Sequence, residues 1–67
     1  MSEADAKQLM LTECQMVYDG IVYLRIDSLE IRYDRTKRTF VLYLLLLDRN
    51  RNSVTRAPAE KCVPVPL

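Results

Sequence analysis

The residues of this chain that could bind a ligand form two groups of cations. Segment 34–38 carries Arg35, Lys37 and Arg38, with the aromatic residues Tyr33 and Phe40 on either side of it. Side chains of these two kinds, close together, are typical of surfaces that follow a nucleic-acid backbone and stack a base. The second group lies in segment 49–51 and consists of Arg49 and Arg51. A nucleic-acid-binding accessory protein that uses these basic loops is therefore one hypothesis.

Two observations weaken the nucleic-acid hypothesis. Segment 39–47 separates the two groups of cations, and as a strand with a rise of about 3.3 Å per residue it would hold them nearly 30 Å apart. The formal net charge of the chain is only +1, whereas phosphate contacts supply most non-specific affinity for nucleic acids. Two separate solvated loops are the simpler interpretation.

Side chains suited to catalysis or metal binding are scarce. The chain has no histidine, and its two cysteines, Cys14 and Cys62, lie far apart in the sequence. We find no G-x-S-x-G, glycine-rich phosphate loop or C-x-x-C pattern. We therefore expect a non-enzymatic protein with no catalytic residue, no cofactor, no metal site and no small-molecule substrate.

Length and composition indicate one small domain. The 67 residues are 49% hydrophobic and 28% charged, as in ordinary globular chains. No stretch reaches the roughly 20 apolar residues of a membrane helix, and the first residues are acidic and polar, unlike a signal peptide. We expect a cytoplasmic protein with no membrane partner, in which both cysteines are reduced.

The first residues leave two alternatives open. Ser2 followed by Glu3 and Asp5 resembles a helix N-cap with an acidic first turn, and Ala6, Leu9 and Met10 could form one apolar stripe. A helix this short is marginal alone, so a flexible tail is the other interpretation. We divide the chain into this tail or helix, 1–12, and a β domain, 13–67.

Apolar alternation in the β domain predicts a hairpin and then a bent strand. Asp19-Gly20 stands between two apolar runs, which favours a tight hairpin turn there. In the strand that follows, the inward phase passes from Leu24 and Ile26 to odd-numbered positions after Asp27-Ser28. Because a slip of one residue reverses the faces of a strand, an inserted bulge or bend is required at Asp27 and Ser28.

The run FVLYLLLL, residues 40–47, predicts a central strand between polar turns. In the second of these turns, 48–53, an asparagine is suited to the left-handed conformation. Residues 54–57 predict a fourth strand, 58–60 a tight or 3₁₀ turn, and 62–65 a last strand confined to an edge by its proline. Five strands with a bent second one fit a small closed barrel of the Src-homology-3 type. An open meander with a helix on one face is the alternative. In such a barrel the first and last strands are neighbours, so we expect Cys14 and Cys62 to be close but reduced.

The central strand is apolar on both faces, which a small barrel cannot bury entirely. If its even-numbered residues fill the core, Val41, Tyr43 and Leu45 stay outside. The N-terminal segment or another protein chain could cover them; left bare, they would form an interaction site. The preferred hypothesis is therefore a binding or assembly module, with a protein partner or a homo-oligomer, that uses this strand face.

Residues 14–65 resemble a loosely defined group of small uncharacterised barrel proteins carried on mobile elements of Gram-positive bacteria. The pattern joins an aromatic-x-Gly-x-x-Tyr segment, a charged loop, alternating tyrosine and aliphatic residues, and a polar turn. The resemblance implies an accessory, non-enzymatic module and assigns no catalytic residue. The matching positions are Tyr18, Gly20, Tyr23, Tyr43, Leu45, Asp48, Asn50, Asn52, Ser53 and Val54.

Overall fold

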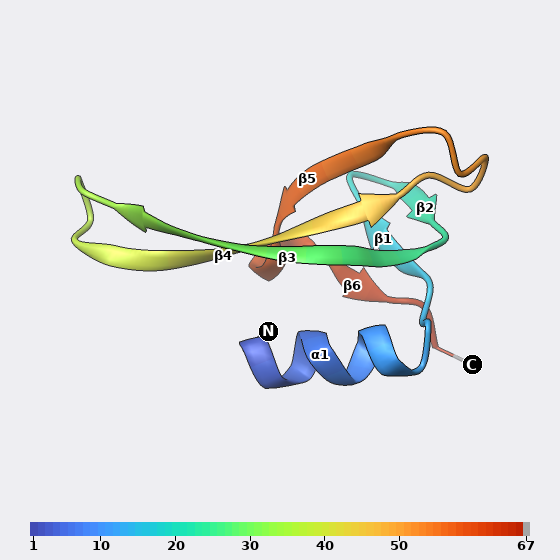
Figure 1. Cartoon of the computed structure of the whole chain (residues 1–67), viewed down its shortest axis with the longest axis horizontal. Coiled ribbons are helices and arrows are strands. Elements are labelled where there is room, and N and C mark those ends of the chain that lie inside the picture. Colours follow the sequence, from blue (N-terminus) through green and yellow to red (C-terminus); the bar gives the residue numbers. More distant parts are fainter. Residues whose placement is uncertain (67) are drawn as a thin grey trace.

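A computed structural model describes residues 1–66 as a mostly β protein with one short α-helix. Leu67, the last residue of the predicted domain 13–67, lies outside the described residues. The elements in chain order are α1 (Glu3–Leu11), β1 (Met16–Tyr18), β2 (Ile21–Tyr23), β3 (Arg25–Asp34), β4 (Thr39–Leu47), β5 (Val54–Pro58), the 3₁₀ helix η1 (Ala59–Lys61) and β6 (Val63–Pro64) (Figure 1). No helix among these residues is long and apolar enough to cross a membrane.

The N-terminal segment is helical, and its sequence explains where the helix begins. The Ser2 hydroxyl accepts a hydrogen bond from the Asp5 N–H, and the Asp5 carboxylate accepts one from the Ser2 N–H, each at 3.1 Å. This reciprocal pair satisfies two N–H groups that a helix start leaves without partners. The apolar stripe is also confirmed, because Ala6 is fully buried and Leu9 and Met10 pack against the core.

The predicted hairpin at Asp19-Gly20 is confirmed. β1 and β2 pair antiparallel with Tyr18 opposite Ile21, so two residues form the turn. Asp19 and Gly20 have φ angles of 52° and 76°, the left-handed conformation that a type I′ turn requires at both positions. Asp19 tolerates this conformation better than most residues do, and Gly20 has no Cβ to oppose it.

The predicted bend takes the form of a bulge, and the strand also breaks three residues earlier. Ile26 pairs with Leu46 and Ser28 with Leu45, so Asp27 is the extra residue. The break at Leu24 divides the predicted second strand into β2 and β3, which lie in different sheets. The result is six strands in two three-stranded sheets, ordered β2-β1-β6 and β3-β4-β5, in place of five strands in one closed barrel.

The core lies between the two sheets and α1. Even-numbered residues of β4 point into it, with Leu44 and Leu46 fully buried together with Ala6 and Met16. The turn after β5 is the 3₁₀ helix η1, as the sequence predicts, and it returns the chain to β6, an edge strand that pairs only with β1. The core is small: β4 contributes Leu44 and Leu46 to it, and Leu42 packs against its edge.

Candidate binding surface

The outer part of the β3–β4 hairpin extends beyond the core. β3 and β4 pair along their whole length, from Arg25 with Leu47 to Asp34 with Thr39, but β5 pairs with β4 only from Tyr43 to Leu47. We call residues 31–42 the arm. Figure 1 shows the arm projecting past η1 and past the start of α1. The arm is therefore a two-stranded ribbon, with solvent where the rest of β4 has a third strand.

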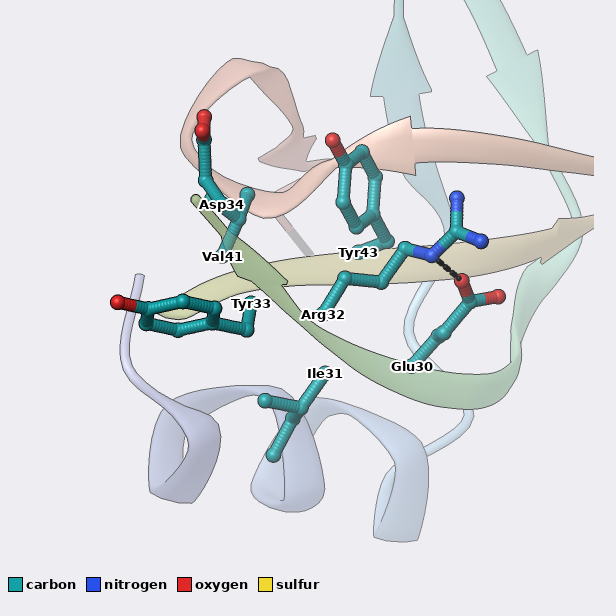
Figure 2. A pocket seen from close by; sticks show the side chains of 7 residues that line it. All are labelled: Glu30, Ile31, Arg32, Tyr33, Asp34, Val41 and Tyr43. Carbon is teal, nitrogen blue, oxygen red and sulfur yellow. Dashed lines mark ion pairs between the residues drawn. The ribbon is translucent and has the colours of Figure 1, made fainter. Parts of the chain in front are cut away.

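One face of the arm, the inner face, continues the core side of the sheet but is not covered. Ile31, Tyr33 and Phe40 on this face are 54%, 50% and 71% exposed. The rings of Tyr33 and Phe40 contact each other edge to face, with centroids 5.3 Å apart. Figure 2 shows Ile31 extending from β3 on the side of α1. Aromatic and aliphatic side chains this exposed, side by side, are typical of a contact surface.

The predicted interaction residues Val41, Tyr43 and Leu45 lie on the opposite, outer face and are half-buried. The helix does not cover them, because α1 packs on the inner side of the sheet (Figure 2). Cover by the N-terminal segment, one of the two alternatives that the sequence left open, is therefore wrong. A second chain is not needed to cover Val41, Tyr43 and Leu45 either, because side chains of the neighbouring strands already cover them in part.

That partial cover is an ion-pair network above Tyr43. The Glu30 carboxylate on β3 accepts from the Arg56 guanidinium on β5 at 3.2 Å and from the Arg32 guanidinium at 3.0 Å. The Arg56 guanidinium also lies 5.8 Å from the centre of the Tyr43 ring, within the range of a cation–π contact. The arginine stems shield apolar surface while their charged ends stay in water. The outer face is thus partly closed by its own strands.

A hollow of about 460 Å³ remains on this face where the network ends. Its lining consists of arm residues together with Glu30 and Tyr43, and Arg32 and Asp34 contribute polar groups (Figure 2). Among residues 1–66 no group of three His, Cys, Asp or Glu side chains is placed to hold a metal ion. The polar groups here are suited to hydrogen bonding.

The two basic loops lie at opposite ends of the molecule, one at the tip of the arm and one beside β5 (Figure 1). All five predicted cations are exposed: Arg35, Lys37, Arg38, Arg49 and Arg51. Each loop is built around an aspartate that accepts hydrogen bonds from the backbone, Asp34 from Thr36 and Lys37 and Asp48 from Asn50. One continuous basic patch is therefore excluded, whereas the tip of the arm does combine cations with exposed rings.

The second loop differs from the prediction in one detail. The sequence suggested that an asparagine would take the left-handed conformation there, but Arg51 does so, with a φ of 61°. Asp48 stabilises this turn with two backbone hydrogen bonds. Its N–H donates to the Ser53 carbonyl at 3.0 Å, and its carbonyl accepts from the Arg51 N–H at 2.8 Å. Hydrogen bonding by Asp48 thus outweighs the intrinsic preference of asparagine.

The cysteines are not neighbours, so the predicted proximity is wrong. β1 and β6 are adjacent as expected, but Met16 pairs with Pro64 and Val17 with Val63. This register places Cys62 opposite Tyr18 and leaves Cys14 about 13 Å further along the strand pair, too far for a disulfide without rearrangement. Both thiols are free, and burial raises the pKa of Cys62.

The exposed inner face of the arm was missed by the sequence reasoning, which assigned Phe40 to a core-facing set. A signal was available in the strand lengths. Segment 54–57 is less than half as long as segment 39–47, so its strand could not flank the whole of the longer one. Side chains on the unflanked part had little chance of burial.

No protein-family model, curated protein or solved structure matches this chain. The resemblance to small barrel proteins of mobile elements therefore stays a prediction.

Proposed function

We propose that this protein is a non-enzymatic binding or assembly module that engages a protein partner through the arm. The observation that carries the proposal is the exposure of Ile31, Tyr33 and Phe40 together on one face of a projecting ribbon. The surface includes Phe40 of the central strand but also Ile31 and Tyr33 of β3, and the proposal moves the main contact from Val41, Tyr43 and Leu45 to the opposite side of the same hairpin.

Partial burial on the outer face supports this choice of side. A partner at Val41 and Tyr43 would first have to displace the arginine side chains that pair with Glu30. The inner face of the arm has no such cover among residues 1–66, and ordering two rings that already touch costs little side-chain entropy. Tyrosine is one of the residue types enriched at interface hot spots, and phenylalanine is enriched in protein interfaces.

A peptide-display selection tests the proposal with random sequences in place of a chosen partner. Random peptides are selected on the immobilised wild-type protein and then measured against Phe40→Ser and Leu11→Ser. Leu11 is the matched control, because it is a large apolar residue, 78% exposed, on the distant end of α1. We expect the selected peptides to lose at least about tenfold in affinity for Phe40→Ser and to bind Leu11→Ser as they bind wild type. Peptides that bind all three proteins equally would refute an arm-centred module.

Nucleic acid is the second candidate, and the tip of the arm is the observation that favours it. Arg35, Lys37 and Arg38 are exposed next to the rings of Tyr33 and Phe40, a combination that suits single strands. Binding of a fluorescent oligonucleotide should then weaken steeply between low and moderate salt. Arg38→Gln should bind more weakly than Arg51→Gln and with a shallower salt dependence. Equal effects of these two substitutions would argue against the arm as the nucleic-acid site.

We also propose a Src-homology-3-like arrangement of the strands and a cytoplasmic location. The first is supported by the bend at Leu24, which connects the two sheets, and by the 3₁₀ turn before the last strand. The second is supported by two free thiols in a small domain, since secreted domains of this size usually rely on disulfides.

A further inference from the structure

The backbone of the arm leaves hydrogen-bonding groups free along one edge of β4. The Leu47 carbonyl faces β3, because it accepts from the Leu24 N–H at 2.9 Å, and the Asp48 N–H faces β5, because it donates to the Ser53 carbonyl. Successive residues of a strand alternate in this direction. Phe40 and Leu42 therefore direct their N–H and C=O groups away from β3. Leu42 faces the end of β5 and the start of η1, whereas β5 is missing beside Phe40.

β5 ends where it does because of Pro58. This residue is the last one paired with β4, opposite Tyr43, and proline has no N–H with which to continue a ladder. The chain then turns into η1, and a hollow of about 550 Å³ remains beside the edge of the arm, lined by Phe40, Leu42 and Lys61 among others. An additional strand placed in line with β5 would occupy this hollow.

We propose that the edge of β4 from Thr39 to Leu42 accepts an extended, acidic peptide segment of a partner protein as a further strand of the β3-β4-β5 sheet. The inference deepens the proposed function and rests on it, because it names how the partner binds the arm. The added strand would extend its side chains alternately to the two faces. One set would meet Phe40 and Leu42 on the inner face, and the other would meet Val41 beside the outer hollow.

Charge favours an acidic partner. Lys37 and Lys61 line the edge hollow and Arg38 immediately precedes the edge, and none of the three forms an ion pair within residues 1–66. The two carboxylates that line the same hollow, Asp34 and Glu60, offset two of these three positive charges, so an excess of one positive charge remains. Carboxylates on an added strand would give these cations partners.

The same features disfavour two other occupants. A second copy that paired antiparallel with this edge would set the basic tip of each arm beside Lys61 of the other copy, and like charges at close range are costly. A nucleic acid could satisfy the cations, but it has no regular series of amide donors and acceptors to match the free groups of Phe40 and Leu42. A peptide backbone matches them directly.

The test uses a synthetic peptide with capped ends, about eight residues long, that alternates valine or tyrosine with glutamate. Two altered versions are compared with it. One carries lysine in place of every glutamate, and the other is N-methylated at every residue, which removes its backbone donors. Binding to the full-length protein is measured by fluorescence anisotropy at fixed salt. We expect saturable binding of the acidic peptide and at least about tenfold weaker binding of both altered versions.

A pair of variants at one position separates the backbone from the side chain. Phe40→Ala removes the ring and keeps the outward N–H, whereas Phe40→Pro also removes that N–H and leaves the β3–β4 ladder intact. We expect Phe40→Pro to bind the acidic peptide at least about tenfold more weakly than Phe40→Ala. If Phe40→Pro fails to fold, binding of the N-methylated peptide to the wild-type protein still tests whether backbone hydrogen bonds are required.

Several results would overturn the proposal. Unchanged binding of the N-methylated peptide would exclude strand addition, and equal binding of the lysine peptide would exclude an acidic partner. Dimerisation that Phe40→Pro abolishes, without peptide binding, would assign the edge to a second copy, and oligonucleotide binding without peptide binding would assign it to nucleic acid. The peptides selected by display distinguish failure of strand addition from failure of the proposed function. If these peptides bind the arm and still bind when N-methylated, the protein is a binding module but does not bind its partner by strand addition.

Discussion

Leu44 and Phe40 stand on the same strand and the same face, two repeats of the pleat apart, yet truncation of each to alanine should have very different costs. Leu44 is fully buried between the sheets, whereas Phe40 is 71% exposed on the arm. Replacing a fully buried leucine with alanine loses its transfer free energy and leaves a cavity, for about 3–5 kcal/mol in total. Replacing Phe40 loses mainly its contact with the Tyr33 ring, for about 0.5–1 kcal/mol.

The effect of each substitution depends on the total free energy of unfolding, which is modest for a small domain. A domain of 67 residues has a free energy of unfolding of about 3–10 kcal/mol, so Leu44→Ala should remove about 30% of it or more. Since 1 kcal/mol shifts the Tm of a domain of this size by about 4–8 °C, Leu44→Ala should lower the Tm by at least about 12 °C. Phe40→Ala should lower it by less than about 8 °C.

Urea unfolding followed by far-ultraviolet circular dichroism measures both values, with Leu11→Ala as an exposed control on α1. The measurement is repeated at two protein concentrations. A cost above about 2 kcal/mol for Phe40→Ala would mean that the arm is packed against something in solution, and the reasoning about its exposure would fail. A cost of this size that appears only at the higher concentration would identify the cover as a second copy.

Three further predictions concern the turn, the helix cap and the thiols. Gly20→Ala should cost about 1–2 kcal/mol in urea unfolding, purely from the positive φ, because a Cβ there would meet no atom within 4 Å. Hydrogen bonds from Ser2 lower the pKa of Asp5 below its ordinary 3.8, so this contribution to helix stability is present above that pH and disappears as the pH falls through the folded-state pKa. A titration of helical circular dichroism should show this loss in wild type and not in Asp5→Asn, which has no carboxyl group to titrate. Burial raises the pKa of Cys62 above 9.0, so at pH 8 iodoacetamide should label Cys14 first, as read by mass spectrometry; equal rates would contradict the burial of Cys62.

Local chemistry made several elements predictable from the sequence. The N-cap at Ser2 and the turn at Asp19-Gly20 depend on residues within a few positions of one another, and both are as expected. The bulge at Asp27 was predictable for a similar reason, since the apolar phase changes within one strand and only an extra residue can accommodate the change.

The candidate site was predictable only in part. The sequence indicated that residues 40–47 are apolar on both faces and that cations stand at either end of them. It did not indicate that Arg56 and Arg32 meet at Glu30 over the outer face, because those residues come from two different strands and their meeting depends on the register of both. It also misplaced Cys14 relative to Cys62, because adjacency of strands does not fix their register.

The pattern of amino acids by itself determined that this chain forms strands, where they turn, and that its central strand has more apolar surface than a small core can bury. Each of these properties follows from steric preference and alternation over a few residues. Only the tertiary structure decided which part of that surface is exposed. Pro58 ends β5 opposite Tyr43, and Arg32 and Arg56 partly cover the outer face. The large apolar residues left exposed on the hairpin are therefore Ile31, Tyr33 and Phe40 on the inner face, because burial depends on which distant element reaches each position.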